Sequence, residues 1–371
     1  MKKSNREIEE RYANEDREIS QERNDFLLPQ IIDFVRNKQW LNLQPEYQRR
    51  QVWEVKRQSA FIESLLMNLP IPPVFLFEPE YSRYEVMDGQ QRLSSIVAFY
   101  ANRLKLAGLE HWNELNGKCY EDLPTKLQRG LDRRRISAVV LQSASDANNS
   151  SELRRIVFER LNTGGQKLNA QELRNCVYAG RFSTLLVELA GVPKFNDLIG
   201  VPRYEDHFIN DQVGIELAKN PLFKRMIDCE IVLRFFALRN SKSIKGSMKS
   251  ILDNCMEQNQ NISESEAQEL AEDFVSRVGF AYSLFGKDAF RVDIDAEGKV
   301  SHPFYDAMII ACDRCFENRA NLLKKKTILK AKLKKAFENQ ANYEILVGRG
   351  NTAESIRSRL NLVENIFKSV L

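Results

Sequence analysis

The stretch YEVMDGQQRLSSIVAFY, residues 84–100, decides the fold of the N-terminal half of this chain. Residues 84–87 alternate as a half-buried strand does, and from Leu93 onward apolar residues recur at helical spacing. A strand is therefore expected to turn into a helix within Asp88–Arg92, which we call the DGQQR motif. Asp88 and Gln91 are spaced as a helix-capping pair, so the helix is expected to begin inside the motif.

The DGQQR motif suits an anion, above all a phosphate. Gly89 lets a ligand approach the backbone N–H groups at the positive end of the helix dipole. Arg92 would add a cation with fork geometry, while Gln90 and Gln91 would offer neutral donors and acceptors. Asp88 would either cap the helix, which the sequence favours, or hold a divalent ion or position a water. On spacing alone, a plain capped turn explains the motif equally well.

The bulk composition is that of a soluble globular protein with two domains. The chain has 371 residues, of which 43% are hydrophobic and 29% charged. No run of about 18 apolar residues occurs and the N-terminus is charged, so no membrane segment and a cytoplasmic location are expected. Six cysteines are too sparse for a disulfide framework, and three scattered histidines disfavour a histidine-dependent nuclease.

The predicted elements divide the chain into an α+β part and a helical part. Residues 1–25 are dense in charge and are expected to form a mobile tail or an exposed helix. An N-terminal α+β domain is expected over residues 26–182, and an all-helical domain over 183–371. Strands are expected at 74–77, 84–87 and 136–141. Helices are expected at 31–37, 56–68, 151–160, 170–179, 221–238, 264–284, 303–317, 320–340 and 352–369.

A second motif, PEYQRRQVW at residues 45–53, places arginines between two large aromatic residues. Arg49 beside Tyr47 or Trp53 would bind a phosphate in-line or stack on a base. In the simpler interpretation, which the motif alone favours, the arginines lie on the surface and Trp53 packs against the following helix.

A third motif, FERLNTGGQKLNAQELRN, spans residues 158–175. Asn169 and Glu172 form a second capping signature after a Gly-Gly turn, and turn formation also explains Asn162. Arg160, Arg174 and Asn175 are polar residues that two helices would bring to this turn. Folding alone does not explain them, and a phosphate or ribose would satisfy their hydrogen-bonding groups.

Two further features of the C-terminal half have simple interpretations. Residues 324–335 contain seven lysines and no acid, which suits non-specific nucleic-acid binding, yet an apolar stripe on the same helix favours a solvated face. Cys312 and Cys315 form a lone C-x-x-C in a helical pattern. Ordinary burial explains that pair better than zinc or redox chemistry does.

Four motifs in order carry a resemblance to a known family: the 45–53 motif, Leu69–Pro73, DGQQR, and the 158–175 motif. Together they resemble the N-terminal domain of GmrSD-type restriction proteins, also called domain of unknown function 262, in the ParB and sulfiredoxin-like fold group. The resemblance covers roughly Phe26–Phe182. It implies a nucleotide-binding or nucleotide-hydrolysing domain used in defence against phage DNA.

The resemblance also implies roles for particular residues. Gly89–Arg92 matches a Gly-x-x-Arg element that meets nucleotide phosphates at a helix start in that fold group. Glu172 and Asn175 are loosely similar to its second nucleotide-contacting box. Many relatives add a nuclease domain with a His-Asn-His motif, and nothing in this chain resembles it.

The sequence thus predicts an NTP-binding, NTP-hydrolysing component of a prokaryotic anti-phage system that acts on or near DNA. The base of the nucleotide is open, and Mg²⁺ is a candidate ion. The alternatives are a non-catalytic nucleotide- or DNA-binding module that regulates a partner nuclease, and, ranked last, a stand-alone metal-dependent nuclease using Asp88 and Glu172. Asp88 and Arg92 are the expected catalytic residues. The expected binding residues are Arg49, Gly89, Gln90, Gln91, Arg92, Arg160, Asn162, Glu172, Arg174 and Asn175.

Overall fold

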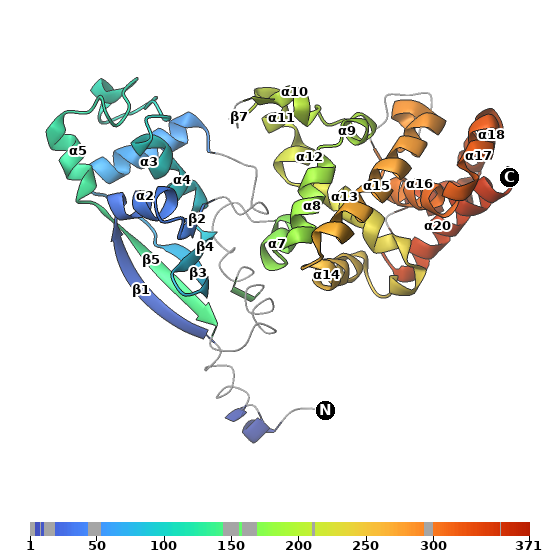
Figure 1. Cartoon of the computed structure of the whole chain (residues 1–371), viewed down its shortest axis with the longest axis horizontal. Coiled ribbons are helices and arrows are strands. Elements are labelled where there is room, and N and C mark those ends of the chain that lie inside the picture. The colour runs from blue at the N-terminus through green and yellow to red at the C-terminus, as the bar shows by residue number, and fades with distance from the viewer. Residues whose placement is uncertain are drawn as a thin grey trace. The chain divides into compact units, whose positions relative to one another are not determined.

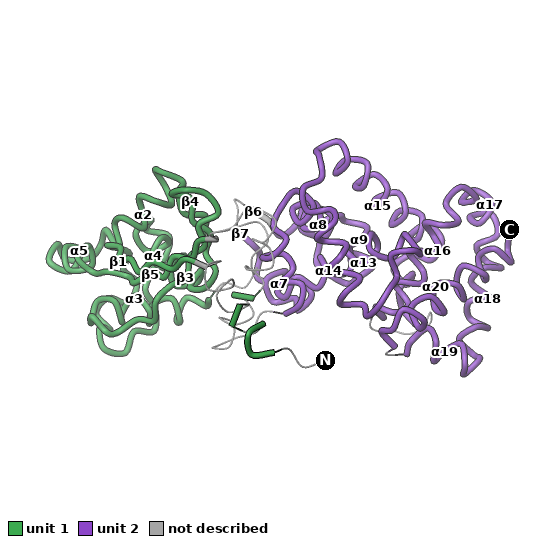
Figure 2. The backbone as a smooth tube through the Cα atoms, turned by 90° about the horizontal axis from the view of Figure 1, so that it is seen from below, with its two compact units in different colours: residues 1–45, 52–167 green, residues 46–51, 168–371 purple. Residues whose placement is uncertain are grey.

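The chain folds into two compact units, each with its own hydrophobic core (Figures 1 and 2). The computed structural model describes residues 4–7, 9–10, 19–43, 53–143, 156–157, 169–209, 212–292, 300–348 and 350–371. Residues 19–43 and 53–143 belong to the first unit and residues from 169 onward to the second, green and purple in Figure 2. The contacts divide the chain at residue 168, whereas the sequence motifs placed the division after residue 182.

The first unit is built on a five-stranded mixed sheet with the order β1-β5-β3-β4-β2. Strands β1 and β5 pair antiparallel, as do β3 and β4, whereas β5 with β3 and β4 with β2 pair in parallel. The predicted strands β3, β4 and β5 are confirmed. The strands are β1 (Ile19–Leu27), β2 (Leu41–Asn42), β3 (Val74–Glu80), β4 (Arg83–Asp88) and β5 (Arg135–Ser143).

Strand β1 corrects the prediction of a charged tail that reaches residue 25. It pairs with β5 along its whole length, from Ile19 opposite Ser143 to Leu27 opposite Arg135. Its sequence, ISQERNDFL, is mostly polar and so lacks the apolar alternation by which a strand is recognised. Residues 5–7 and 9–10 are helical and exposed, as one of the two alternatives for the tail predicted.

Helix α4 (Gln90–Tyr100) is the central helix of the first unit. It contacts α2 (Leu28–Arg36) and α3 (Val55–Leu66), and α5 (Thr125–Asp132) in turn contacts both of those helices. The apolar residues that predicted α4 are buried, with Leu93 and Ile96 both 0% exposed. Because these side chains anchor the helix in the core, the start of α4 is held firmly at the end of β4.

The second unit is mostly helical, as predicted, with one short two-stranded ribbon of β6 (Phe208–Ile209) and β7 (Gln212–Val213). None of the described helices combines the length and apolar character needed to cross a membrane. The helices are α7 (Ala170–Val177), α8 (Arg181–Ala190), α9 (Pro193–Ile199), α10 (Tyr204–His207), α11 (Ile215–Lys219), α12 (Pro221–Lys224), α13 (Ile227–Arg239), α14 (Met248–Asn259), α15 (Glu264–Phe285), α16 (His302–Arg314), α17 (Arg319–Lys324), α18 (Lys326–Glu338), α19 (Gln340–Val347) and α20 (Ala353–Lys368).

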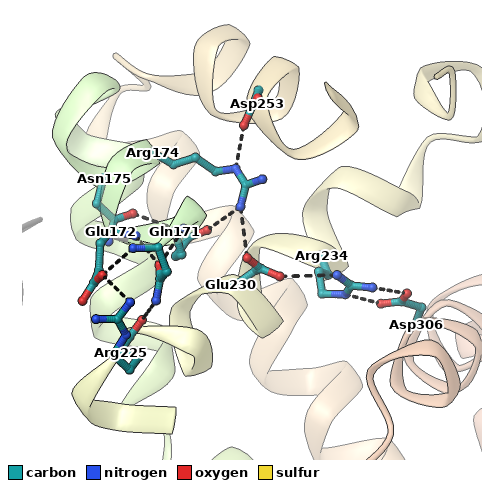
Figure 3. Close-up of polar contacts among 10 residues, drawn as sticks. Gln171, Glu172, Arg174, Asn175, Arg225, Glu230, Arg234, Asp253 and Asp306 are labelled. Carbon is teal, nitrogen blue, oxygen red and sulfur yellow. Dashed lines mark hydrogen bonds and ion pairs between the residues drawn. The ribbon is translucent and has the colours of Figure 1, made fainter. Parts of the chain in front are cut away.

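Helix α13 lies inside the second unit and contacts α8, α14 and α16. A buried ion pair joins it to α16: Arg234 donates from Nε and Nη2 to the two carboxylate oxygens of Asp306, each at 2.8 Å (Figure 3). Asp306 is 0% exposed, and the guanidinium of Arg359 on α20 lies 3.9 Å from it. One carboxylate therefore offsets positive charge from two neighbouring helices.

Asp306→Ala is expected to lower the free energy of unfolding of the second unit by about 3–5 kcal/mol, because Arg234 would stay buried without its two-pronged carboxylate partner and would keep only the contact with Glu230 at 3.5 Å. Urea unfolding followed by far-ultraviolet circular dichroism measures this change. Replacing both partners by apolar residues, Arg234→Met with Asp306→Leu, should recover only part of the loss, because Arg359 stays buried without the carboxylate. Glu264→Gln, which removes an exposed partner of Arg181, is the control and should unfold like the wild type. An Asp306→Ala protein as stable as the control would contradict the assignment.

Candidate functional site

The turn between β4 and α4 has the strand-to-helix form that the DGQQR motif predicted. Gly89 is the N-cap of α4 and has a left-handed backbone, with φ +98°. A Cβ atom at this position would lie 2.4 Å from Cγ1 of Val74 on β3. Both the backbone conformation and the close approach of Val74 therefore require glycine.

The expected cap by Asp88 is wrong. Helix α4 begins at Gln90, no side chain caps it, and Asp88 is the last residue of β4. The carboxylate of Asp88 instead accepts a hydrogen bond at 2.7 Å from Nη2 of Arg92, one helical turn further on. Its side chain stays 55% exposed. The helix starts one residue later than the capping pattern implies, so the Asp88 carboxylate does not accept from the first helix N–H groups. It pairs with Arg92 instead.

Arg92 is held by the protein on both arms of its guanidinium. Besides the bond to Asp88, Nη1 donates to the carbonyl oxygens of Pro72 and Pro73, just before β3. Only 12% of the side chain is exposed. Burial lowers the pKa of Arg92, and the neighbouring Asp88 opposes this shift. The cation is thus fixed in position by the fold, without help from a ligand.

The two glutamines of the DGQQR motif form hydrogen bonds with the backbone of Leu43 and Trp53. Gln90 donates from Nε2 to the carbonyl oxygen of Leu43 at 2.9 Å. Oε1 of Gln91 accepts from the backbone N–H of Trp53 at 2.8 Å. Segment 44–52, which includes Arg49, lies outside the described residues. These two contacts give the glutamines a structural role that the sequence did not reveal.

Trp53 packs against α3, as the simpler interpretation of the second motif predicted. Its ring meets Phe61 edge-on with centroids 5.8 Å apart, and the guanidinium of Arg57 lies 4.6 Å from its ring centre. The stacking of Arg57 on Trp53 is a contact that the sequence motifs did not predict. The position of Arg57 four residues after Trp53, at helical spacing, was the available signal.

The α7 residues of the third motif lie in the second unit. The predicted capping box is confirmed: Oδ1 of Asn169 accepts from the N–H groups of Gln171 and Glu172, each at 2.9 Å, and Oε2 of Glu172 accepts from Asn169 N–H at 2.7 Å. Glu172 is 0% exposed and lies 3.4 Å from the guanidinium of Arg225. Its carboxylate therefore stabilises the start of α7.

Arg174 and Asn175 also have partners inside the second unit (Figure 3). Arg174 contacts Asp253 on α14 at 2.7 Å and Glu230 on α13 at 3.1 Å. Asn175 accepts from Nε2 of Gln171 at 2.8 Å. These contacts account for both side chains through helix packing, without a ligand. Arg160 and Asn162 lie outside the described residues.

The cysteine pair behaves as ordinary buried residues, as expected. Cys312 is 0% exposed and Cys315 is 2% exposed, and burial raises the pKa of both thiols. Within the described ranges, no three side chains of His, Cys, Asp or Glu gather as a metal site would. The described candidate site is therefore the turn at Gly89, with Asp88 and Arg92 beside it.

The two glutamines should respond differently to the same substitution, because Gln90 donates the bond to Leu43, whereas Gln91 accepts the bond from Trp53. Gln90→Glu places an oxygen against the carbonyl of Leu43 and should lower the free energy of unfolding of the first unit by about 1–3 kcal/mol. Gln91→Glu keeps the acceptor for Trp53 and should lose less stability than Gln90→Glu does. All three tryptophans (Trp40, Trp53 and Trp112) lie in this unit, so tryptophan fluorescence in urea reports it alone. Equal losses in both variants would contradict these assignments.

Comparison with protein-family models matches residues 28–179 to the family described as "GmrSD restriction endonuclease, N-terminal domain". Neither the curated proteins nor the solved structures give a match. The matched region runs from the start of α2 to just beyond α7, so it contains the turn at Gly89 and the capping box of α7. Residues 28–179 of this chain are therefore similar to the N-terminal domain of GmrSD restriction endonucleases.

Proposed function

We propose that this chain is a nucleotide-binding and NTP-hydrolysing component of a restriction-type defence system, with the NTP phosphates bound at the N-terminus of α4. The observation that carries the proposal is the turn at Gly89. There a helix start without a side-chain cap lies beside an exposed carboxylate and a fixed guanidinium. The family supports the defence role, because it is the N-terminal domain of a restriction endonuclease.

The start of α4 supplies the attraction for phosphate. A helix N-terminus carries the equivalent of about half a positive charge, and its first N–H groups point outward. No side-chain oxygen caps these N–H groups in α4. Arg92 adds a full charge whose position the carbonyls of Pro72 and Pro73 already fix. Such preorganised charge assists phosphoryl transfer without a covalent catalyst.

Asp88 is the residue that would hold Mg²⁺ or orient the attacking water. Magnesium is commonly bound by one or two protein carboxylates together with the substrate phosphates. A single carboxylate that is 55% exposed at the phosphate site fits that pattern. The ion would neutralise charge on the phosphates, and Asp88 would then be shared between the ion and Arg92.

DNA cutting is assigned to a partner nuclease. The stand-alone nuclease hypothesis needed Asp88 and Glu172 together as acids for metal ions. Glu172 instead caps α7, with its side chain 0% exposed. The chain would therefore couple nucleotide binding to a DNA-directed partner.

Asp88→Asn separates binding from hydrolysis. The amide keeps an oxygen for Arg92 but loses the charge for Mg²⁺ or water, so phosphate release should fall by about 100-fold or more while the nucleotide remains bound. Arg92→Ala should abolish the thermal stabilisation by NTP, which for the wild type amounts to about 2.7 kcal/mol at a ligand concentration of 100 times Kd. Arg83→Ala, an exposed cation at the start of β4, is the control and should match the wild type in both assays.

Two results would change the proposal. Equal thermal shifts in wild type and Arg92→Ala would place the nucleotide elsewhere. Since Arg92 also holds Pro72 and Pro73, Arg92→Lys and a circular dichroism spectrum separate loss of binding from loss of fold. Binding without phosphate release by the wild type would establish the alternative, a non-catalytic module that regulates its partner nuclease.

A further inference from the structure

Helix α5 of the first unit carries an exposed row of cations that neither the fold nor the nucleotide site uses. Lys126, Arg129 and Arg133, which we call the α5 cationic face, are all exposed. With Thr125 and Gly130 they line a shallow pocket of about 470 Å³ that contains no acidic side chain. The face is therefore a concentrated positive surface on a structured element.

The spacing of the three cations places them on one side of the helix. Lys126 and Arg129 lie on α5, and Arg133 is the C-cap residue directly after it, so the three stand at positions i, i+3 and i+7, which recur on the same face of a helix. With a rise of about 1.5 Å per residue, the row is about 10 Å long. Gly130 lies between Arg129 and Arg133 and has no side chain, which leaves the hollow open.

The charge of this face is not neutralised locally. Within the part of the chain that the structure describes, these three side chains form no hydrogen bond or ion pair. The one acid of α5, Asp132, is instead held by Tyr100 and Tyr120, whose hydroxyls donate to its Oδ1 at 3.0 and 2.8 Å. Asp132, the only carboxylate of α5, therefore pairs with tyrosine hydroxyls and not with the cations of the α5 cationic face.

The neighbouring acids and the neighbouring arginine have other partners. Glu121 pairs with the amide of Asn102, and Asp122 accepts from the backbone N–H of Cys119. Arg134, which follows directly, donates to the carbonyls of Leu65 and Leu66 at the end of α3 and so has a structural role. No such role accounts for the three residues of the α5 cationic face.

We propose that the α5 cationic face binds the phosphate backbone of duplex DNA. Duplex DNA carries one negative charge per about 1.7 Å of its axis, so a row of about 10 Å meets several phosphates at once. A shallow, open pocket can contact an extended polyanion that runs across the surface, whereas proteins usually enclose small molecules. The inference rests on the DNA-directed role proposed above, but not on the nucleotide site.

The other basic segment of the protein is a weaker candidate. In the lysine-rich residues 324–335, Lys325 donates to the carbonyls of Val370 and Leu371, and Lys332 donates to that of Ser369. These lysines therefore stabilise the C-terminal end of α20. Leu329 and Leu333 of α18 are buried, as the predicted apolar stripe required.

The salt dependence of DNA binding tests the proposal. Fluorescence anisotropy of a labelled duplex with the full chain gives the slope of log K against log salt, which changes by about 0.9 for each phosphate contact. The triple variant Lys126→Ala, Arg129→Ala, Arg133→Ala should bind more weakly and show a slope shallower by about 2 to 3. Its thermal unfolding should match the wild type, because the three side chains have no partners in the described structure.

The matched control removes the same charge from the second unit, with Lys324→Ala, Lys326→Ala and Lys335→Ala. It should keep the wild-type slope. A slope lost in the control and kept in the α5 variant would overturn the proposal and move the DNA surface to α17 and α18. No DNA binding by the wild type would also overturn it. DNA binding is measured without nucleotide, and nucleotide binding without DNA, so that failure of either proposal is distinguishable.

Discussion

The guanidinium of Arg92 is the constraint on which the turn at Gly89 depends. One arm reaches back to Asp88 at the end of β4, and the other reaches the carbonyls of Pro72 and Pro73 before β3. Val74, the next residue, lies against Gly89 so closely that no Cβ would fit. The side chain of Arg92, together with the close packing that Gly89 allows, thereby holds β3, β4 and the start of α4 together. The helix N-terminus consequently has a fixed position before any ligand arrives.

The remaining residues of the DGQQR motif extend that constraint to the second motif. Gln90 and Gln91 bind the backbone at Leu43 and Trp53, on either side of segment 44–52. The five residues of the motif thus contact the start of β3 and the backbone at Leu43 and Trp53. In the proposed function, the same contacts would hold the donors and charges for a phosphate in place before it binds.

In the second unit, charged side chains lie inside a helical core and are paired with one another. Helix α13 is surrounded by other helices, so its polar side chains can only pair with those of its neighbours. Arg174 contacts Glu230, Glu230 contacts Arg234, and Arg234 contacts Asp306 (Figure 3). This chain of ion pairs links α7 to α16 through α13. The polar residues of α7 are therefore part of the architecture of the helical unit.

The sequence by itself determined what depends on residues three or four apart. It predicted the strand-to-helix turn at Gly89, the helical C-terminal half and the capping box of Asn169 and Glu172, because helices and caps are made by such neighbours. The prediction for Asp88 failed. A capping pair has its partner three residues further on and the ion pair with Arg92 has it four residues further on, so only the exact start of α4 decides between the two. Only the tertiary structure decided the pairing of the polar strand β1 with β5 and the partners of Gln90 and Gln91, which lie 47 and 38 residues away. Such contacts join chain segments that the fold brings together, and no local pattern of apolar and polar residues records them.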